Sequence, residues 1–233
     1  MVIGATAYGV ANPHSRSGAR RVFQEKLAAR AVAYDRVAIL LGEIDLGHLV
    51  WVRSARDGTS VDEQIASSAR NLAAFARDVV VAEGGFRPDQ VVLLGSVLPA
   101  IRNNTESAHA LRKQVDASQA TRTAKTLAFN ELLRRTCAEE GYGWVDISSD
   151  ILGGDGVVAT QFVRTDRENH LDSEATYELW IRKLSVDKIG RATRTLSRRA
   201  TAQSHDDGAA ANGDGEIGGD SDAEEGEEED EGG

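Results

Sequence analysis

The sequence predicts an α/β fold with a mostly parallel sheet, formed by residues 1–202 and followed by an acidic tail over residues 203–233. Apolar runs bounded by turn residues alternate with long stretches at helical spacing, a pattern typical of crossover units on a parallel sheet. The 233 residues suit one core, because domains of roughly 100–200 residues are usual.

Three apolar runs are expected to form strands: residues 37–41, 91–94 and 144–147. The first is apolar throughout, which predicts a strand covered on both faces. Each run ends in a polar or glycine-containing loop, as strands followed by crossovers do.

Helical spacing predicts helices over residues 18–31, 61–83, 117–140 and 173–199. Gly141 marks the end of the third helix, because glycine readily adopts the left-handed conformation found there. Ser173, with Glu174 in the first turn, indicates where the last helix begins.

The net charge of -10 comes from the tail, where residues 203–233 hold 13 of the 37 acidic residues and no Lys or Arg. We expect this tail to be disordered and solubilising, since it has too few apolar residues to offset its ordering entropy. The remaining 24 acidic and 27 basic residues leave the body nearly neutral. The sequence therefore predicts no nucleic-acid partner. The concentrated basic residues are interpreted as a solvated helix face that the tail partly neutralises: Arg182, Lys183, Lys188, Arg191, Arg194, Arg198 and Arg199.

A single cysteine, Cys137, excludes an internal disulfide framework and fits a reducing compartment. No stretch approaches the roughly 20 apolar residues of a membrane span, and the first twenty residues lack the order of a signal peptide. We therefore expect a cytoplasmic protein without a membrane partner. The oligomeric state is not predicted.

The loop after the first predicted strand carries two carboxylates, Glu43 and Asp45, beside Gly42. Ligands of open parallel sheets bind beyond the carboxyl ends of the strands, which makes this loop a candidate cleft. The alternative is a structural loop in which Asp45 caps the next segment. His48 and Trp51 either line the same cleft or are a surface histidine and a packed tryptophan.

A polar loop before the last helix, residues 164–172, contains His170 among carboxylates. A carboxylate beside an imidazole fixes its tautomer and stabilises its charged form. Alternatively, His170 is a helix-start residue without a task. The glycine block that begins at Gly4 is a third candidate, since small residues let a backbone amide approach a ligand. No cofactor motif is present, and His14, His109 and His205 lack metal-ligand spacing.

The order of these segments resembles the SGNH/GDSL hydrolases: a glycine block, a strand ending in Gly-x-x-Asp, a Leu-Pro loop (Leu98-Pro99) and a late Asp and His block (Asp166, His170). It is most similar to a bacterial branch in which the third block reads Gly-Glu-x-Asp and which often accompanies surface-polysaccharide genes. The resemblance spans about residues 3–198. It implies a three-layer α/β/α sandwich of the flavodoxin-like kind and ester hydrolysis by a serine.

The resemblance implies that His170 is the base, Asp166 its orienting partner and Gly4 an oxyanion-hole donor. Three departures affect the site. The Gly-Asp-Ser nucleophile block should precede the glycine block, so we expect the first strand and its serine to be missing. A misplaced gene start is the favoured explanation, and a domain that is damaged or completed in trans is the alternative. Residues 42–45 offer carboxylates where the family has an asparagine, and Asp166 and His170 are four apart instead of three, which leaves Glu168 as an alternative.

Three serines are candidate substitutes for the missing nucleophile: Ser15, Ser17 and Ser96. None follows the strand-to-helix pattern that exposes a nucleophile. Three functions stay open. The first is a hydrolase of small-molecule or carbohydrate esters that is inactive or incomplete in this chain. The second is a non-catalytic carbohydrate- or protein-binding domain derived from one. The third is a metal-assisted hydrolase with Glu43, Asp45, Asp166 and His170 as ligands.

Overall fold

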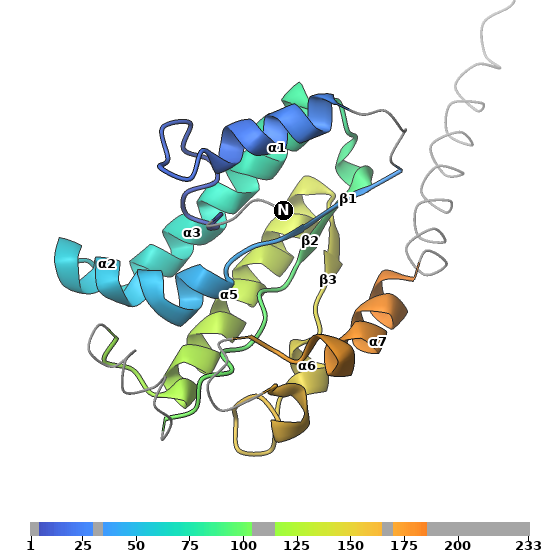
Figure 1. The fold of residues 1–233 in the computed structure, drawn as a ribbon. Coiled ribbons are helices and arrows are strands. Elements are labelled where there is room, and N and C mark those ends of the chain that lie inside the picture. Colours follow the sequence, from blue (N-terminus) through green and yellow to red (C-terminus); the bar gives the residue numbers. More distant parts are fainter. Residues whose placement is uncertain (1–4, 30–34, 104–114, 165–169, 186–233) are drawn as a thin grey trace, which may run out of the picture. The chain divides into compact units, whose positions relative to one another are not determined.

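A computed structural model describes residues 5–29, 35–103, 115–164 and 170–185 (Figure 1). Its centre is a parallel sheet of three strands in the order β1-β2-β3, with bounds Val37–Leu40, Val91–Leu94 and Gly143–Val145. All three predicted strands are therefore confirmed. The third ends two residues earlier than expected, because the Asp146 side chain turns back to accept the Ser148 N–H at 2.8 Å.

Helices connect and cover these strands. The α-helices are α1 (Ala19–Ala28), α2 (Val50–Asp57), α3 (Val61–Phe75), α5 (Gln119–Glu140), α6 (Ser148–Ile151) and α7 (Ser173–Leu184). Segments of other helical types are η1 (Asp45–Leu49) and η2 (Ala76–Glu83), which are π-helical, and η3 (Pro88–Gln90) and η4 (Thr160–Phe162), which are short 3₁₀ turns. The predicted helix over 61–83 is thus α3 continued by η2, whereas the helical run 45–57 was not predicted.

The helix ends follow local side-chain chemistry. Ser60 and Glu63 form a reciprocal capping box at the start of α3, which satisfies two otherwise unpaired amides. Gly141 ends α5 at φ +74°, as predicted. Helix α7 begins at Ser173, as predicted, and its N-cap is Asp172. The Oδ1 atom of Asp172 accepts the backbone N–H groups of Glu174 and Ala175 at 2.9 and 3.0 Å.

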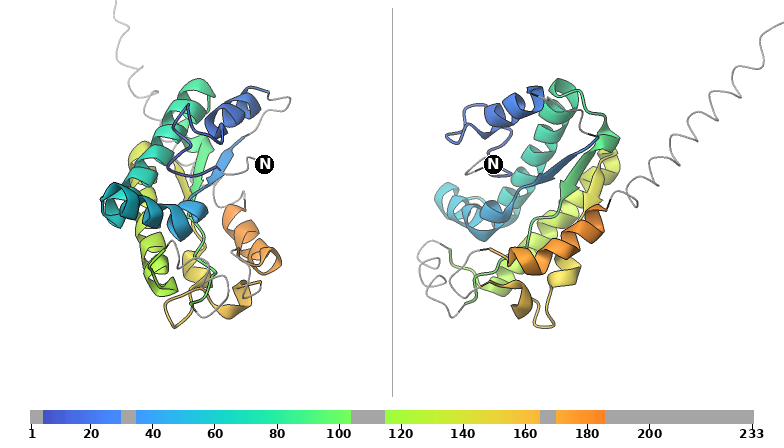
Figure 2. Two further views of the ribbon diagram at one scale, coloured as in Figure 1. Left: turned by 60° about the vertical axis from the view of Figure 1, so that its left-hand side comes forward. Right: turned by 45° about the vertical axis from the view of Figure 1, so that its right-hand side comes forward.

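The two faces of β2 meet different helices. Val91 and Leu93 belong to a large cluster with residues of α3 and α5, while Val92 and Leu94 pack with Trp180 of α7. Two further views show α7 on the opposite side of the strands from α3 and α5 (Figure 2). The alternation arises because successive strand side chains point to opposite faces. An α/β fold with a small parallel sheet and helices is therefore established.

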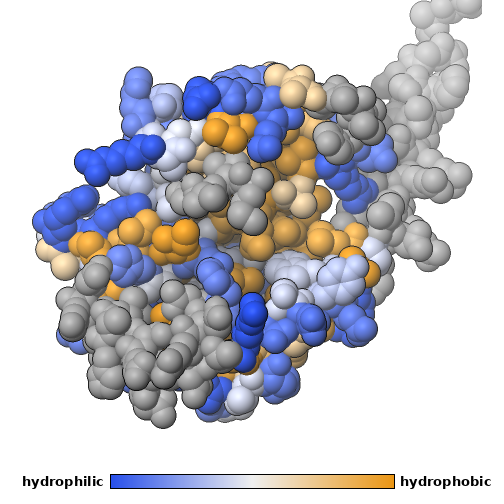
Figure 3. All heavy atoms as spheres, viewed as in Figure 1, coloured by the Kyte–Doolittle hydropathy of each residue, from blue (hydrophilic) through white to orange (hydrophobic). Residues whose placement is uncertain are grey.

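Strand β1 corrects one expectation. It was predicted to be covered on both faces, but Leu40 is 45% exposed and Ala38 lies on the same open face. Among the strands that the structure describes, β1 pairs only with β2 and lies at the edge. Apolar side chains gather over the strands in the space-filling view (Figure 3). Helix α7 covers β2 and β3, so the open face of β1 lacks such a cover within the described ranges.

Several predictions concern residues outside the described ranges: Gly4, Asp166, Glu168, the members of the basic run after Lys183, and the acidic tail. Within the described part of α7, Arg182 and Lys183 form ion pairs with Asp150 at 3.7 and 2.6 Å. No helix in the described ranges is long and apolar enough to cross a membrane.

Candidate active site

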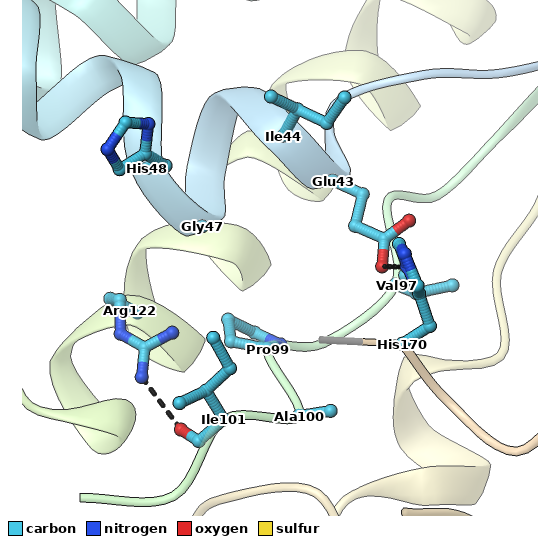
Figure 4. A pocket seen from close by; sticks show the side chains of 10 residues that line it. All are labelled: Glu43, Ile44, Gly47, His48, Val97, Pro99, Ala100, Ile101, Arg122 and His170. Atoms are coloured by element: carbon cyan, nitrogen blue, oxygen red, sulfur yellow. Dashed lines mark hydrogen bonds and ion pairs between the residues drawn. The ribbon is translucent and has the colours of Figure 1, made fainter. Parts of the chain in front are cut away.

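A pocket of about 300 Å³ lies where the segments that follow β1 and β2 meet (Figure 4). The carboxyl ends of parallel strands meet at one edge of a sheet, which is where such folds bind ligands. The lining is apolar on the side of the segment after β2, and its polar side chains, Glu43, His48, Arg122 and His170, come from other segments. It consists of Glu43, Ile44, Gly47, His48, Val97, Pro99, Ala100, Ile101, Arg122 and His170.

His170 and Glu43 meet at this pocket although 127 positions separate them in the sequence. The distance from His170 Nδ1 to Glu43 Oε1 is 2.8 Å, and the two side chains are 68% and 41% exposed. An exposed pair adds little stability. Its effect is orientation: a carboxylate that accepts the Nδ1–H leaves Nε2 of a neutral imidazole free to accept a proton.

The backbone at Gly42 directs Glu43 toward the pocket. Gly42 has φ +121°, a backbone conformation that residues other than glycine rarely adopt. A Cβ atom added there would lie 3.0 Å from Phe129 and 3.1 Å from Ser96. Its carbonyl accepts the Leu46 N–H at 2.8 Å and so starts the helical turn of η1. The chain thereby turns sharply from β1 into a helix, with Glu43 at the corner.

Asp45 points away from the pocket lining into the interior. It is fully buried, and its two oxygens accept the backbone N–H groups of Ala7 and Tyr8 at 2.8 and 3.1 Å. Arg53 lies 3.8 Å away. Burial raises the pKa of Asp45 above its ordinary value, against the lowering effect of those amides and of Arg53. Asp45 thus ties the segment after Gly4 to η1, a role that neither the cleft hypothesis nor the capping alternative anticipated.

Asn130 of α5 holds the opposite wall. Its Oδ1 accepts the Ser96 N–H at 2.8 Å, and its Nδ2 donates to the Ser96 carbonyl and to Ser148 Oγ, both at 3.0 Å. All three partners are buried. This clamp fixes the start of the segment that continues to Val97 and Ile101, and so positions the apolar wall.

Arg122 of α5 lies on a further side of the pocket and was missed in the sequence. It is only 2% exposed, its Nη2 donates to the Ile101 carbonyl at 2.8 Å, and its Nε has no hydrogen-bond partner. Burial lowers its pKa to about 10. Within the helical stretch its spacing resembles that of ordinary surface arginines, so no local pattern distinguished it.

The other cleft candidates and the three candidate serines lie in different surroundings. His48 lines the pocket, whereas Trp51 packs against the core and donates its Nε1–H to the Leu46 carbonyl at 2.8 Å. Ser96 is fully buried and is not part of the pocket lining. Ser15 and Ser17 lie 3.4 Å apart by their hydroxyls on the loop before α1.

The described residues contain no group of three or more His, Cys, Asp or Glu side chains placed to hold a metal ion. Of the four ligands considered for a metal, Glu43 and His170 are adjacent, and Asp45 bonds to backbone amides instead. Asp166 lies outside the described residues. Of these four proposed metal ligands, the described residues therefore bring together only the Glu43 carboxylate and the His170 imidazole at the pocket.

Comparison with known proteins gives a distant structural likeness. No family model and no curated protein matches the sequence. A solved structure from Streptococcus pneumonia, provisionally described as a platelet activating factor, is similar with a TM-score of 0.44 and 18% sequence identity. The likeness covers 68% of this chain and 66% of that one, slightly under two thirds of its length.

Proposed function

We propose that the chain is an ester hydrolase domain of the SGNH/GDSL type, in which His170 is the general base and Glu43 orients it. The observation that carries this proposal is the 2.8 Å contact between the two side chains at the pocket. Each was singled out from a separate loop, and a base oriented by a carboxylate beside an apolar pocket suits acyl transfer. The three-layer α/β/α sandwich and an acylated carbohydrate as substrate belong to the same proposal.

In this mechanism His170 Nε2 removes the proton of the attacking hydroxyl as its oxygen bonds to the ester carbonyl carbon. The imidazolium that forms is stabilised by the Glu43 carboxylate. The tetrahedral intermediate then expels the alkoxide, which takes the proton from Nε2, and the carbon–oxygen bond of the ester breaks. When the attacking group is water, the products are an acid and an alcohol. When it is a serine, the alcohol leaves and an acyl-enzyme remains; a water activated by His170 then attacks the acyl carbon, which releases the acid and restores the serine hydroxyl.

Glu43 takes the role that the family resemblance gave to Asp166. Asp166 lies outside the described residues, so its own contribution stays a prediction. A glutamate from another loop serves this purpose chemically, because the orienting group needs only a carboxylate oxygen within hydrogen-bond distance of Nδ1.

The test is hydrolysis of p-nitrophenyl butyrate by the wild-type chain, by His170→Ala and by Glu43→Gln. We expect kcat/KM to fall by about 10²–10⁴ in His170→Ala, the usual contribution of a general base, and less in Glu43→Gln, whose amide oxygen still accepts the Nδ1–H. His14→Ala is the matched control, because His14 is exposed on the loop before α1. Equal turnover by wild type and His170→Ala would refute the proposal.

A second candidate is a binding domain without turnover. It is favoured by one observation: none of the ten described residues that line the pocket carries a hydroxyl or a thiol. A fluorophosphonate probe separates the two ideas, since it labels an activated serine wherever that serine lies in the chain. A folded protein that binds ligand in the pocket, hydrolyses no aryl ester and takes no label would favour the binding domain.

A further inference from the structure

Arg122 is a buried cation whose charge is not balanced by any carboxylate of the residues that the structure describes. Two other arginines with little exposed side-chain surface have acidic partners, Arg20 with Glu83 and Arg53 with Asp45. Arg122 has instead one backbone carbonyl and a bare Nε. An arginine stays charged in proteins, so burial without a counter-charge is costly. An anionic ligand that pairs with the Arg122 guanidinium offsets that cost.

The surroundings of Arg122 suit such an anion. Arg122 lines the pocket, and it lies in the first turn and a half of α5, whose N-terminus contributes positive partial charge. The neighbouring wall is apolar, with Val97, Pro99 and Ala100. A guanidinium in apolar surroundings binds a carboxylate strongly, because its planar fork matches the two oxygens and little water competes.

We propose that the pocket recognises an aliphatic carboxylate, whose charged end pairs with Arg122 and whose chain lies against the apolar wall. The volume of about 300 Å³ equals roughly ten water molecules, which accommodates a chain of about six carbons. The Glu43 carboxylate repels the anion from the other side of the pocket, so the ligand binds in one direction.

The direction in which the ligand binds limits the class of substrate, and this step rests on the proposed function. Arg122 and His170 lie on opposite sides of the pocket in the close view (Figure 4). A ligand held by Arg122 through its carboxylate therefore presents its other end to His170. The substrate class that follows is a half ester of a dicarboxylic acid, with the free carboxylate at Arg122 and the scissile ester at His170.

The first test measures binding and is independent of hydrolysis. Hexanoate and the neutral hexanamide, which has the same shape, are titrated into the wild-type chain, Arg122→Met and Arg135→Met, and affinities are measured by NMR. We expect wild type to prefer hexanoate at least tenfold and Arg122→Met to lose that preference. Arg135→Met should retain it, since Arg135 is an exposed residue of the same helix that pairs with Glu131.

Thermal unfolding shows whether Arg122 is instead structural. Methionine fills similar space without a charge, so we expect the melting temperature of Arg122→Met to rise by a few degrees, or at least not to fall. If Arg122→Met fails to fold, Arg122→Lys decides: lysine keeps the charge but not the fork, and the preference for hexanoate should drop severalfold. Equal binding of the two probes by wild type, or a preference that survives in Arg122→Met, would overturn the proposal.

The second test compares p-nitrophenyl hydrogen glutarate with p-nitrophenyl butyrate as substrates. A lower KM for the charged ester in wild type, lost in Arg122→Met, supports the half ester. Hexanoate binding without any hydrolysis would leave carboxylate recognition in place and refute the proposed function. Hydrolysis that depends on His170 but shows no preference for the charged probes would support the proposed function and refute carboxylate recognition by Arg122.

Discussion

Replacing Asp45 by alanine should destabilise the fold, because its carboxylate is the partner of two backbone amides. The Ala7 and Tyr8 N–H groups donate to it at 2.8 and 3.1 Å, and Ala7 is fully buried. Hydrogen bonds to a charged group contribute about 1.5–3 kcal/mol each. Since the substitution also removes a carboxylate whose burial is costly, we expect a net loss of about 2–4 kcal/mol in the free energy of unfolding.

The pH dependence of the same site gives a sharper test. The pKa of Asp45 is raised in the folded state by burial, so the folded protein binds this proton more tightly than the unfolded chain does. The stability contributed by the protonated form is fully present below the ordinary pKa of 3.8 and is lost as the pH rises through the folded pKa. Asp45→Asn lacks this titration. The stability of wild type relative to Asp45→Asn should therefore fall as the pH increases over that window.

Urea unfolding followed by circular dichroism measures both effects. Asp89→Asn is a matched control, because Asp89 is an exposed aspartate paired with Arg87, and its removal should leave stability nearly unchanged. The structural role would be refuted if Asp45→Ala unfolded at the same urea concentration as wild type. A constant difference between wild type and Asp45→Asn from pH 3 to pH 7 would refute the argument about its pKa.

Three further substitutions or probes test the packing around the site. Gly42→Ala should cost about 1–3 kcal/mol by urea unfolding, because alanine is strained at φ +121° and its Cβ would crowd Ser96, whereas Gly154→Ala, which meets open space at an ordinary φ, should cost far less. Asn130→Ala should cost about 3 kcal/mol in the same assay, because the buried amide and carbonyl of Ser96 lose their partner. Cys137 should resist a thiol reagent at pH 8 in the folded protein and react in urea, because burial raises its pKa to about 12; fast labelling without urea would contradict its burial.

The regular elements were predictable where apolar spacing is unambiguous. The runs at 37–41 and 91–94 and the long helical pattern at 117–140 all formed the expected type of element. The run at 91–94 is buried throughout, whereas β1 buries only Ile39 and the buried stripe of α5 is largely polar. The helical run 45–57 was not anticipated, since it begins at an aspartate and contains a glycine, both weak helix formers. Tertiary contacts override that preference: Asp45 is fixed by backbone amides, and Leu46 and Val50 are buried in the core.

The candidate site was predictable only in part, for a physical reason. Loops rich in carboxylates and histidine stand out by composition, which singled out Glu43 and His170. Which carboxylate meets the histidine depends on how the sheet brings separate loops together, and local spacing favoured sequence neighbours of His170 instead. Arg122 gave no signal, because burial of one arginine within a long helix is decided by the segment packed over it and not by the helix itself.

Glu43 and Asp45 are two residues apart, and the turn between them explains why they differ. The chain leaves β1 at Gly42 and enters a helical turn, so side chains two positions apart lie on different sides of it. Glu43 faces the pocket and His170, while Asp45 faces the interior and the amides of residues 7 and 8. The inner carboxylate fixes the helical turn from which the outer one extends. Residues 42–45 thus supply one carboxylate that positions the loop and another that lines the pocket beside His170.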